Sequence, residues 1–171
     1  MLIREPTLAD VDRIADVHTR ARASYYQTGG LLADSTADPA GADHRREAWT
    51  QAVESPDHTI YCAVIDDKVV GAVAMGPALT PTPDGTPAGQ LFQIHVDPPH
   101  WSKGIGTRLH ATFLTYLRRT NTPTGLLEVW QQNTRALLFY AHHGWSPTGT
   151  HRPGPHQTTY QSMHLKLPTP A

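Results

Sequence analysis

Val96-Asp97-Pro98-Pro99-His100-Trp101-Ser102-Lys103-Gly104-Ile105-Gly106-Thr107 joins a short apolar run to an amphipathic one. The run LFQIHV that leads into it is typical of a strand, whereas the run TRLHATFLTYL that leads out of it is typical of a helix. A turn with two glycines at such a junction leaves backbone N–H groups exposed at the positive end of the helix. It can bind a phosphate or pyrophosphate, although a plain strand-to-helix connection has the same outline.

Two common phosphate-binding motifs do not fit this turn. A Walker A loop requires Gly-Lys-Ser/Thr, but here Lys103 precedes Gly104. A dinucleotide-binding fingerprint requires a third small residue three positions after Gly106, where this chain has Leu109. The turn therefore belongs to neither of these two classes of nucleotide-binding motif.

The periods of the apolar residues predict an α/β domain around the turn. Helices are expected at residues 8–26, 43–54, 105–119 and 133–142, with N-caps at Thr7, Asp43 and Asn133. Strands are expected at 2–4, 59–65, 68–75, 90–96, 125–130, 145–148 and 158–167, with loops at 28–42, 76–89 and 149–157. A turn at Asp66-Asp67 makes the second and third strands a hairpin. This order predicts a mixed sheet with helices on both faces.

Length and composition fit a single globular domain over residues 1–171. The formal net charge is -1 and no run of Lys or Arg occurs, which excludes non-specific binding to nucleic acid or to anionic membranes. No apolar stretch is long enough to span a bilayer, and the N-terminus lacks the apolar core of a signal peptide. The single cysteine, Cys62, excludes an internal disulfide, predicts a buried structural thiol and suits a cytoplasmic location.

Two groups of residues resemble the GNAT superfamily of acetyl-CoA-dependent N-acetyltransferases. The family signature Q/R-x-x-G-x-G/A, after a strand ending in Val-x-Pro, is matched by Val96-Asp97-Pro98 and Trp101-Ser102-Lys103-Gly104-Ile105-Gly106, with Trp101 in the place of Gln or Arg. A second match, similar to the family's L-E-V…N…A…FY…GF, comprises Leu127-Glu128-Val129, Asn133, Ala136, Phe139-Tyr140 and Gly144-Trp145. The resemblance extends from about residue 2 to residue 167, and it implies a GNAT fold with a mostly antiparallel sheet.

The resemblance also implies where acetyl-CoA binds. The cosubstrate would lie against strand 90–96, where Ile94 and Val96 offer backbone groups to the pantetheine arm and the thioester. The pyrophosphate would lie on the N–H groups of the glycine turn, and Lys103 or Arg108 would add charge unless they are solvated surface residues. Asn133 would reach the pantetheine arm, or act only as a helix cap. The implied cofactor residues are Ile94, Val96, Trp101, Ser102, Lys103, Gly104, Ile105, Gly106, Thr107 and Asn133.

Acetyl transfer to an amine needs a base for the amine proton and an acid for the leaving thiolate. The resemblance assigns the acid to Tyr140, whose alternative is a core aromatic. Gln90 or Gln93 stands where the family often has a glutamate, and an amide cannot accept the proton. The candidate base is therefore Glu128, acting through water, unless it is a solvent-facing strand residue. His95 ranks second, and strand alternation puts it on the face of Gln93, opposite Ile94 and Val96.

The acceptor predicted from the resemblance is a primary amine of a small molecule or of a peptide N-terminus. Its pocket would be walled by Tyr25, Tyr26 and the loops 28–42, 76–89 and 149–157. No nucleic-acid or membrane partner is expected, and the oligomeric state stays open, a homodimer included. The chain has eleven histidines, but their spacings match no zinc pattern, so no metal is expected. The alternative function is a non-catalytic acyl-CoA-binding or partner-binding module on the same fold.

Overall fold

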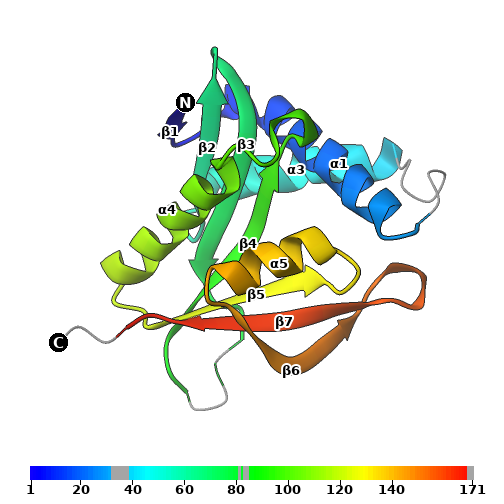
Figure 1. Cartoon of the computed structure of the whole chain (residues 1–171). Coiled ribbons are helices and arrows are strands. Elements are labelled where there is room, and N and C mark those ends of the chain that lie inside the picture. The colour runs from blue at the N-terminus through cyan, green and yellow to red at the C-terminus, as the bar shows by residue number, and fades with distance from the viewer. Residues whose placement is uncertain (32–38, 81, 83–84, 169–171) are drawn as a thin grey trace.

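The computed structural model describes residues 1–31, 39–80, 82 and 85–168, within which seven strands form one sheet (Figure 1). The strands are β1 (Leu2–Arg4), β2 (Thr59–Ile65), β3 (Lys68–Pro77), β4 (Ala88–Val96), β5 (Thr124–Trp130), β6 (Ser146–Pro153) and β7 (Thr159–Lys166). The α-helices are α1 (Val11–Thr28), α3 (Pro39–Glu54), α4 (Ile105–Arg119) and α5 (Thr134–His142). The sheet order is β1-β2-β3-β4-β5-β7-β6, which confirms the predicted mixed, mostly antiparallel α/β fold.

The centre of the sheet is its least continuous part. All neighbouring strands are antiparallel except β4 and β5, which run parallel and pair only through residues 88–90 and 124–126. Beyond these three pairs the two strands diverge, as Figure 1 shows. The register of β4 against β3 also shifts between Ala74 and Met75, and such a bulge bends the strand that carries it. The divergence opens the sheet on the C-terminal side of both strands.

Each face of the sheet is covered by its own helices and its own apolar core. On one face, α1 and α3 bury residues that include Ile14, Trp49 and Cys62. On the other, α4 and α5 bury a larger cluster that includes Phe113, Leu117 and Tyr140. Helices on both faces were predicted from the order of strands and helices along the chain, and this prediction is confirmed. The predicted burial of Cys62 is also confirmed, since its side chain is fully enclosed.

The buried carboxylate Asp97 fixes α1 against the end of β4. Its Oδ2 accepts hydrogen bonds from the Nη2 atoms of Arg13 at 3.1 Å and Arg20 at 2.9 Å, both on α1. Its backbone N–H donates to the carbonyl of Val70 on β3 at 2.9 Å. Asp97 is also the residue at which the chain leaves the sheet for the glycine turn. This network therefore positions the turn relative to α1.

Most predicted elements are confirmed. The Asp66-Asp67 turn has positive φ at both residues, 49° and 59°, as a two-residue hairpin requires. Asn133 caps α5 by accepting the N–H of Ala136 at 3.2 Å. Thr7 precedes a short 3₁₀ turn, Leu8–Asp10, and its N–H donates to Asp10 at 2.8 Å, in the manner of a capping box.

Two predicted boundaries are wrong. The second helix begins at Pro39 rather than at Asp43, because proline fits the first turn of a helix where no N–H bond is needed. Asp43 therefore lies inside the helix and is not its cap. Strand β6 continues to Pro153, through a segment whose prolines and glycines predicted a loop over 149–157. Proline is tolerated there because β6 is an edge strand. Of the other predicted loops, residues 32–38, 81, 83 and 84 lie outside the described residues.

Candidate active site

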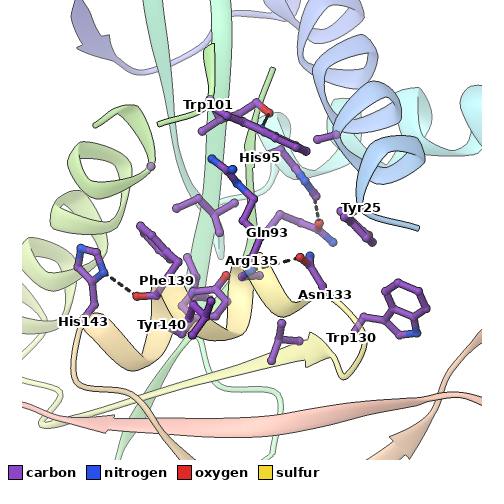
Figure 2. A pocket seen from close by; sticks show the side chains of 18 of the residues that line it. Tyr25, Gln93, His95, Trp101, Trp130, Asn133, Arg135, Phe139, Tyr140 and His143 are labelled. Atoms are coloured by element: carbon purple, nitrogen blue, oxygen red, sulfur yellow. Dashed lines mark hydrogen bonds between the residues drawn. The ribbon is translucent and has the colours of Figure 1, made fainter. Parts of the chain in front are cut away.

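A cavity of about 890 Å³ lies between the diverging ends of β4 and β5. Its walls come from α1, β4, the glycine turn, β5, α5 and the paired strands β6 and β7. In Figure 2, Tyr25 and Trp130 lie on one side of the view and His143 on the other, with Tyr140 between them. The cavity therefore joins the α1 side of the sheet to the side covered by α4 and α5.

The glycine turn leaves its backbone N–H groups uncommitted. Ser102 and Gly104 adopt positive φ, 60° and 76°, and α4 starts directly after Gly104. Within the described part of the chain, no protein group accepts a hydrogen bond from the N–H groups of residues 102–107. Free N–H groups at a helix N-terminus are the donor set that a pyrophosphate needs. The predicted cofactor residues Ser102, Lys103, Gly104, Ile105, Gly106 and Thr107 thus form a turn that fits this part of acetyl-CoA.

Trp101 connects the start of this turn to the end of β4 through a hydrogen bond. Its indole Nε1 donates to the backbone carbonyl of Val96 at 2.6 Å, so this carbonyl is already bonded. The guanidinium of Arg135 on α5 stacks over the Trp101 ring with Cζ at 4.4 Å from the centroid. Its Nη2 lies 3.4 Å from Ser102 Oγ. Arg135 therefore reaches from α5 to the glycine turn, and Figure 2 shows its side chain directed toward Trp101.

The other predicted cofactor residues differ in which of their atoms are already in contact with the protein. Lys103 turns its ammonium back onto the carbonyl of Pro99 at 3.0 Å, where it is exposed to solvent. Asn133 uses Oδ1 for its cap, and its Nδ2 has no partner among the described residues. Ile94 and Val96 pack against the α4 and α5 core, which confirms that they face away from Gln93 and His95.

Tyr140 lines the cavity from α5 and is buried, with 7% of its surface exposed. Its ring contacts the rings of Phe139 and Trp145, with centroids 5.4 Å and 5.9 Å away. Burial raises the pKa of the Tyr140 phenol well above its ordinary value, so the group is protonated at neutral pH. Its hydroxyl has no hydrogen-bond partner in the described residues. Tyr140 is therefore a proton donor whose hydroxyl donates to no other group in the part of the chain that the structure describes.

Glu128 lies on β5, and its carboxylate is bound by Arg152 of β6. Both Nε and Nη2 of Arg152 contact Oε2 at 2.7 Å, whereas Oε1 has no partner in the part of the chain described here. Arg152 also stacks over Tyr160 at 4.3 Å. The predicted loop 149–157 thus contributes Arg152 to the cavity wall, and the only carboxylate lining the cavity among the described residues is Glu128.

His95 is paired with a second histidine that the sequence analysis did not single out as a site residue. The rings of His95 and His18, on α1, stack with centroids 3.9 Å apart and planes inclined by 15°. His95 Nε2 lies 2.7 Å from Gln93 Oε1, and His18 Nδ1 accepts a hydrogen bond from Trp49 Nε1 at 3.2 Å. Burial, together with the charges of Arg45 and Arg22, lowers the pKa of His95 to about 3. Burial also lowers the pKa of His18 far below its ordinary value, so both rings are neutral at pH 7.

The buried histidines predict a stability that rises with pH. Burial lowers the pKa of His110 to about 4 and of His95 to about 3. Between these values and the ordinary histidine pKa of about 6.5, only the unfolded chain binds these protons. The stabilisation is complete above about pH 6.5 and is lost as the pH falls toward the folded values. We expect urea unfolding at pH 4 to 7 to show this rise.

His110→Gln should make that rise shallower, because His95 still contributes to it. His110 Nε2 accepts the indole N–H of Trp145 at 2.9 Å, a bond that a glutamine oxygen can replace without titrating in this range. The exposed His151, changed to Gln, is the matched control and should leave the slope as in the wild type. An equal slope in the wild type and in His110→Gln would contradict the assignment.

Residues that the sequence analysis did not place at the site come from α1, α5 and the last hairpin: His18, Arg22, Arg135, Arg152 and Tyr160. Helical spacing marks His18, Arg22 and Tyr25 as one face of α1, which could have indicated their grouping. No local signal joins them to β4 and β5. Among the described residues, no three His, Cys, Asp or Glu side chains converge as a metal site. Within the same residues, no helix has the length and apolar character that crossing a bilayer requires.

Comparison with known proteins identifies one family. The model of the Acetyltransferase (GNAT) family matches residues 21–145. A PaiA N-acetyltransferase from Thermoplasma acidophilum, solved with coenzyme A, superposes with a TM-score of 0.74 at 14% identity, covering 97% of this chain and 98% of that one. The ribosomal-protein-S18-alanine N-acetyltransferase of Escherichia coli superposes with a TM-score of 0.72 at 18% identity, covering 99% and 96%. No curated protein matches in sequence.

Proposed function

The chain belongs to the acetyltransferase (GNAT) family, and from this premise we propose that it transfers the acetyl group of acetyl-CoA to a primary amine of a small molecule or of a peptide N-terminus, within a ternary complex. One observation carries the proposal. The cavity between β4 and β5 is lined by the glycine turn (Ser102 and residues 104–107), by Tyr140 and by Glu128. Among the described residues, the N–H groups of this turn and the Tyr140 hydroxyl have no hydrogen-bond acceptor.

In this reaction the acceptor nitrogen bonds to the acetyl carbon as the carbon–sulfur bond breaks. The nitrogen loses a proton, and the departing thiolate gains one. On the cofactor side, the turn from Ser102 to Thr107 would hold the pyrophosphate, and Asn133 Nδ2 would reach the pantetheine arm. Arg135 extends the predicted set, because its guanidinium already lies at the turn and can add positive charge there.

Tyr140 would donate the proton that the thiolate gains. Its support is the combination of a protonated phenol, a hydroxyl without a partner in the described part of the chain and a place in the cavity wall. A buried phenol is a weak acid toward water, yet it can transfer a proton to a thiolate formed beside it.

Glu128 is the proposed base, acting through a water molecule at its free Oε1. The pairing of Oε2 with Arg152 fixes the carboxylate, which lines the cavity, and leaves Oε1 without a partner among the described residues. His95 ranks second for a physical reason. A ring with a pKa of about 3 holds a proton poorly at neutral pH, and its Nε2 is already bonded to Gln93.

The proposal is tested by thiol release from acetyl-CoA with a panel of primary amines. Release that requires an amine, with formation of the N-acetyl product, supports transfer in this cavity. Tight binding of CoA without turnover on any amine would favour a non-catalytic acyl-CoA-binding module instead. Absence of CoA binding would contradict both functions. The order of substrate addition follows from initial rates, where a ternary complex gives intersecting rather than parallel lines.

Glu128→Gln should lower kcat/KM by roughly tenfold, since the glutamine keeps the shape of the side chain without its basicity. Glu47→Gln on the exposed face of α3 is the matched control and should keep the wild-type kcat/KM. A Glu128→Gln variant with the kcat/KM of the wild type would move the base to His95 or to solvent. His95→Gln then distinguishes these two.

A further inference from the structure

The charged side chains that line the cavity are unequal in sign. Among the described residues they comprise three arginines, Arg22, Arg135 and Arg152, and one carboxylate, Glu128. Arg135 lies at the glycine turn, where the phosphates of acetyl-CoA would neutralise it. On the α1 side, Arg152 is paired with Glu128. On that side, Arg22 is therefore the arginine whose charge is not balanced by a carboxylate among the described cavity-lining residues.

Arg22 faces this side of the cavity from α1. It lies one helical turn after His18, whose ring stacks on His95, and its guanidinium lies over the ring of Tyr26 at 4.5 Å from Cζ to the centroid. It is half-buried, and in the described part of the chain it forms no ion pair. By contrast, Arg13 and Arg20 of the same helix both bind Asp97.

The positive charge of Arg22 acts on the two stacked histidines, His18 and His95. It contributes, after burial, to the low pKa of both His18 and His95. The buried Arg45 acts on the same two rings in the same sense. A field that keeps histidines neutral also disfavours an ammonium ion, because both are cations near the same positive groups. An acceptor bearing several ammonium groups is therefore poorly matched to this side of the cavity.

We propose that the acceptor amine carries a carboxylate within a few bonds of its nitrogen, and that Arg22 binds this carboxylate. The acceptor class is then that of free amino acids, and the products are an N-acetyl amino acid and CoA. The half-buried rings of Tyr25 and Tyr160 line the same side and offer an apolar surface to its side chain. This inference rests on the proposed acetyl transfer and goes further by naming the acceptor.

The test compares matched acceptors that differ only in the carboxylate. L-Phenylalanine, L-methionine and glycine are each assayed against their amides, at a pH above the ordinary pKa of either amine so that both nitrogens are neutral. A charged hydrogen bond of ordinary strength predicts that kcat/KM favours the acids by about 10- to 100-fold. Spermidine is included as an acceptor without a carboxylate and should be the poorest substrate.

Arg22 variants separate recognition of the carboxylate from folding. Arg22→Gln should reduce the preference for acids over amides to about twofold or less, whereas Arg22→Lys, which keeps the charge, should retain part of it. Both variants should bind CoA as the wild type does. Arg118→Gln, which removes an exposed charge at the end of α4, is the matched control and should keep the full preference.

The outcomes that overturn the inference are distinct from those that overturn the proposed function. Faster acetylation of the amides or of spermidine by the wild type would leave acetyl transfer intact and exclude a carboxylate-bearing acceptor. An undiminished preference in Arg22→Gln would exclude Arg22 as its binding residue. If no amine in either set is acetylated although CoA binds, both the proposed function and this inference fail.

Discussion

Tyr140→Phe should lower kcat by at least tenfold, toward the roughly 100-fold that a positioned proton donor commonly contributes. The variant removes one oxygen atom from a ring that is otherwise held by Phe139 and Trp145. Because the hydroxyl has no partner among the described residues, the free energy of unfolding should change by less than about 0.5 kcal/mol. The affinity for CoA should also be unchanged, so the loss would lie in the chemical step.

Tyr116→Phe is the matched control for this result. Tyr116 is a buried tyrosine of α4 with 8% of its surface exposed, and it does not line the cavity between β4 and β5. It should keep wild-type kcat. A Tyr140→Phe enzyme with wild-type kcat would show that solvent protonates the thiolate, and equal losses in both variants would point to a general effect on the fold.

Gly125→Val should lower the free energy of unfolding by about 3 kcal/mol, at the upper end of the usual cost of overpacking. Gly125 pairs with Gly89 in the three-residue junction of β4 and β5, directly under α4. A Cβ atom at Gly125 would lie 2.9 Å from Cε1 of Phe113 and 3.2 Å from Cδ1 of Leu117. Both side chains are fully buried, so neither has space into which it can move.

The comparison of Gly125→Ala with Gly106→Ala isolates this contact. A Cβ atom at Gly106 would be 3.5 Å from the nearest atom, in the ring of Phe139, which is an ordinary contact. Gly106 lies in the first turn of α4, where alanine should be neutral or stabilise by up to about 1 kcal/mol. Gly125→Ala should instead destabilise by roughly 1 to 2 kcal/mol. Urea unfolding that gave both variants the same sign would contradict this packing argument.

Much of the fold follows from local sequence. The period of Leu109, Phe113 and Leu117 predicts α4 and its buried face, and two consecutive Asp residues predict the hairpin turn. The extension of β6 beyond the predicted strand 145–148, as far as Pro153, could not be predicted locally. Prolines normally indicate a loop, and they are accommodated here because β6 is an edge strand that pairs on one side only, with β7.

The site was predictable where its residues are close in sequence and unpredictable where they are distant. The turn at Ser102 to Thr107 combines a strand end with a helix start, so its free N–H groups follow from the chain itself. The stack of His18 on His95 joins residues that only the packing of α1 onto the sheet brings together. The pairing of Glu128 with Arg152 likewise depends on the register of β5, β7 and β6.

The alternation of side chains along β4 has a consequence for how such an enzyme can change over evolutionary time. Gln93 and His95 face α1, whereas Ile94 and Val96 face α4 and α5. In the proposed complex, a mutation at Gln93 or His95 would alter the surface offered to the acceptor and leave the surface offered to the cosubstrate unchanged. On that proposal, a lineage could acquire new acceptors by single replacements and still use the same source of acetyl groups.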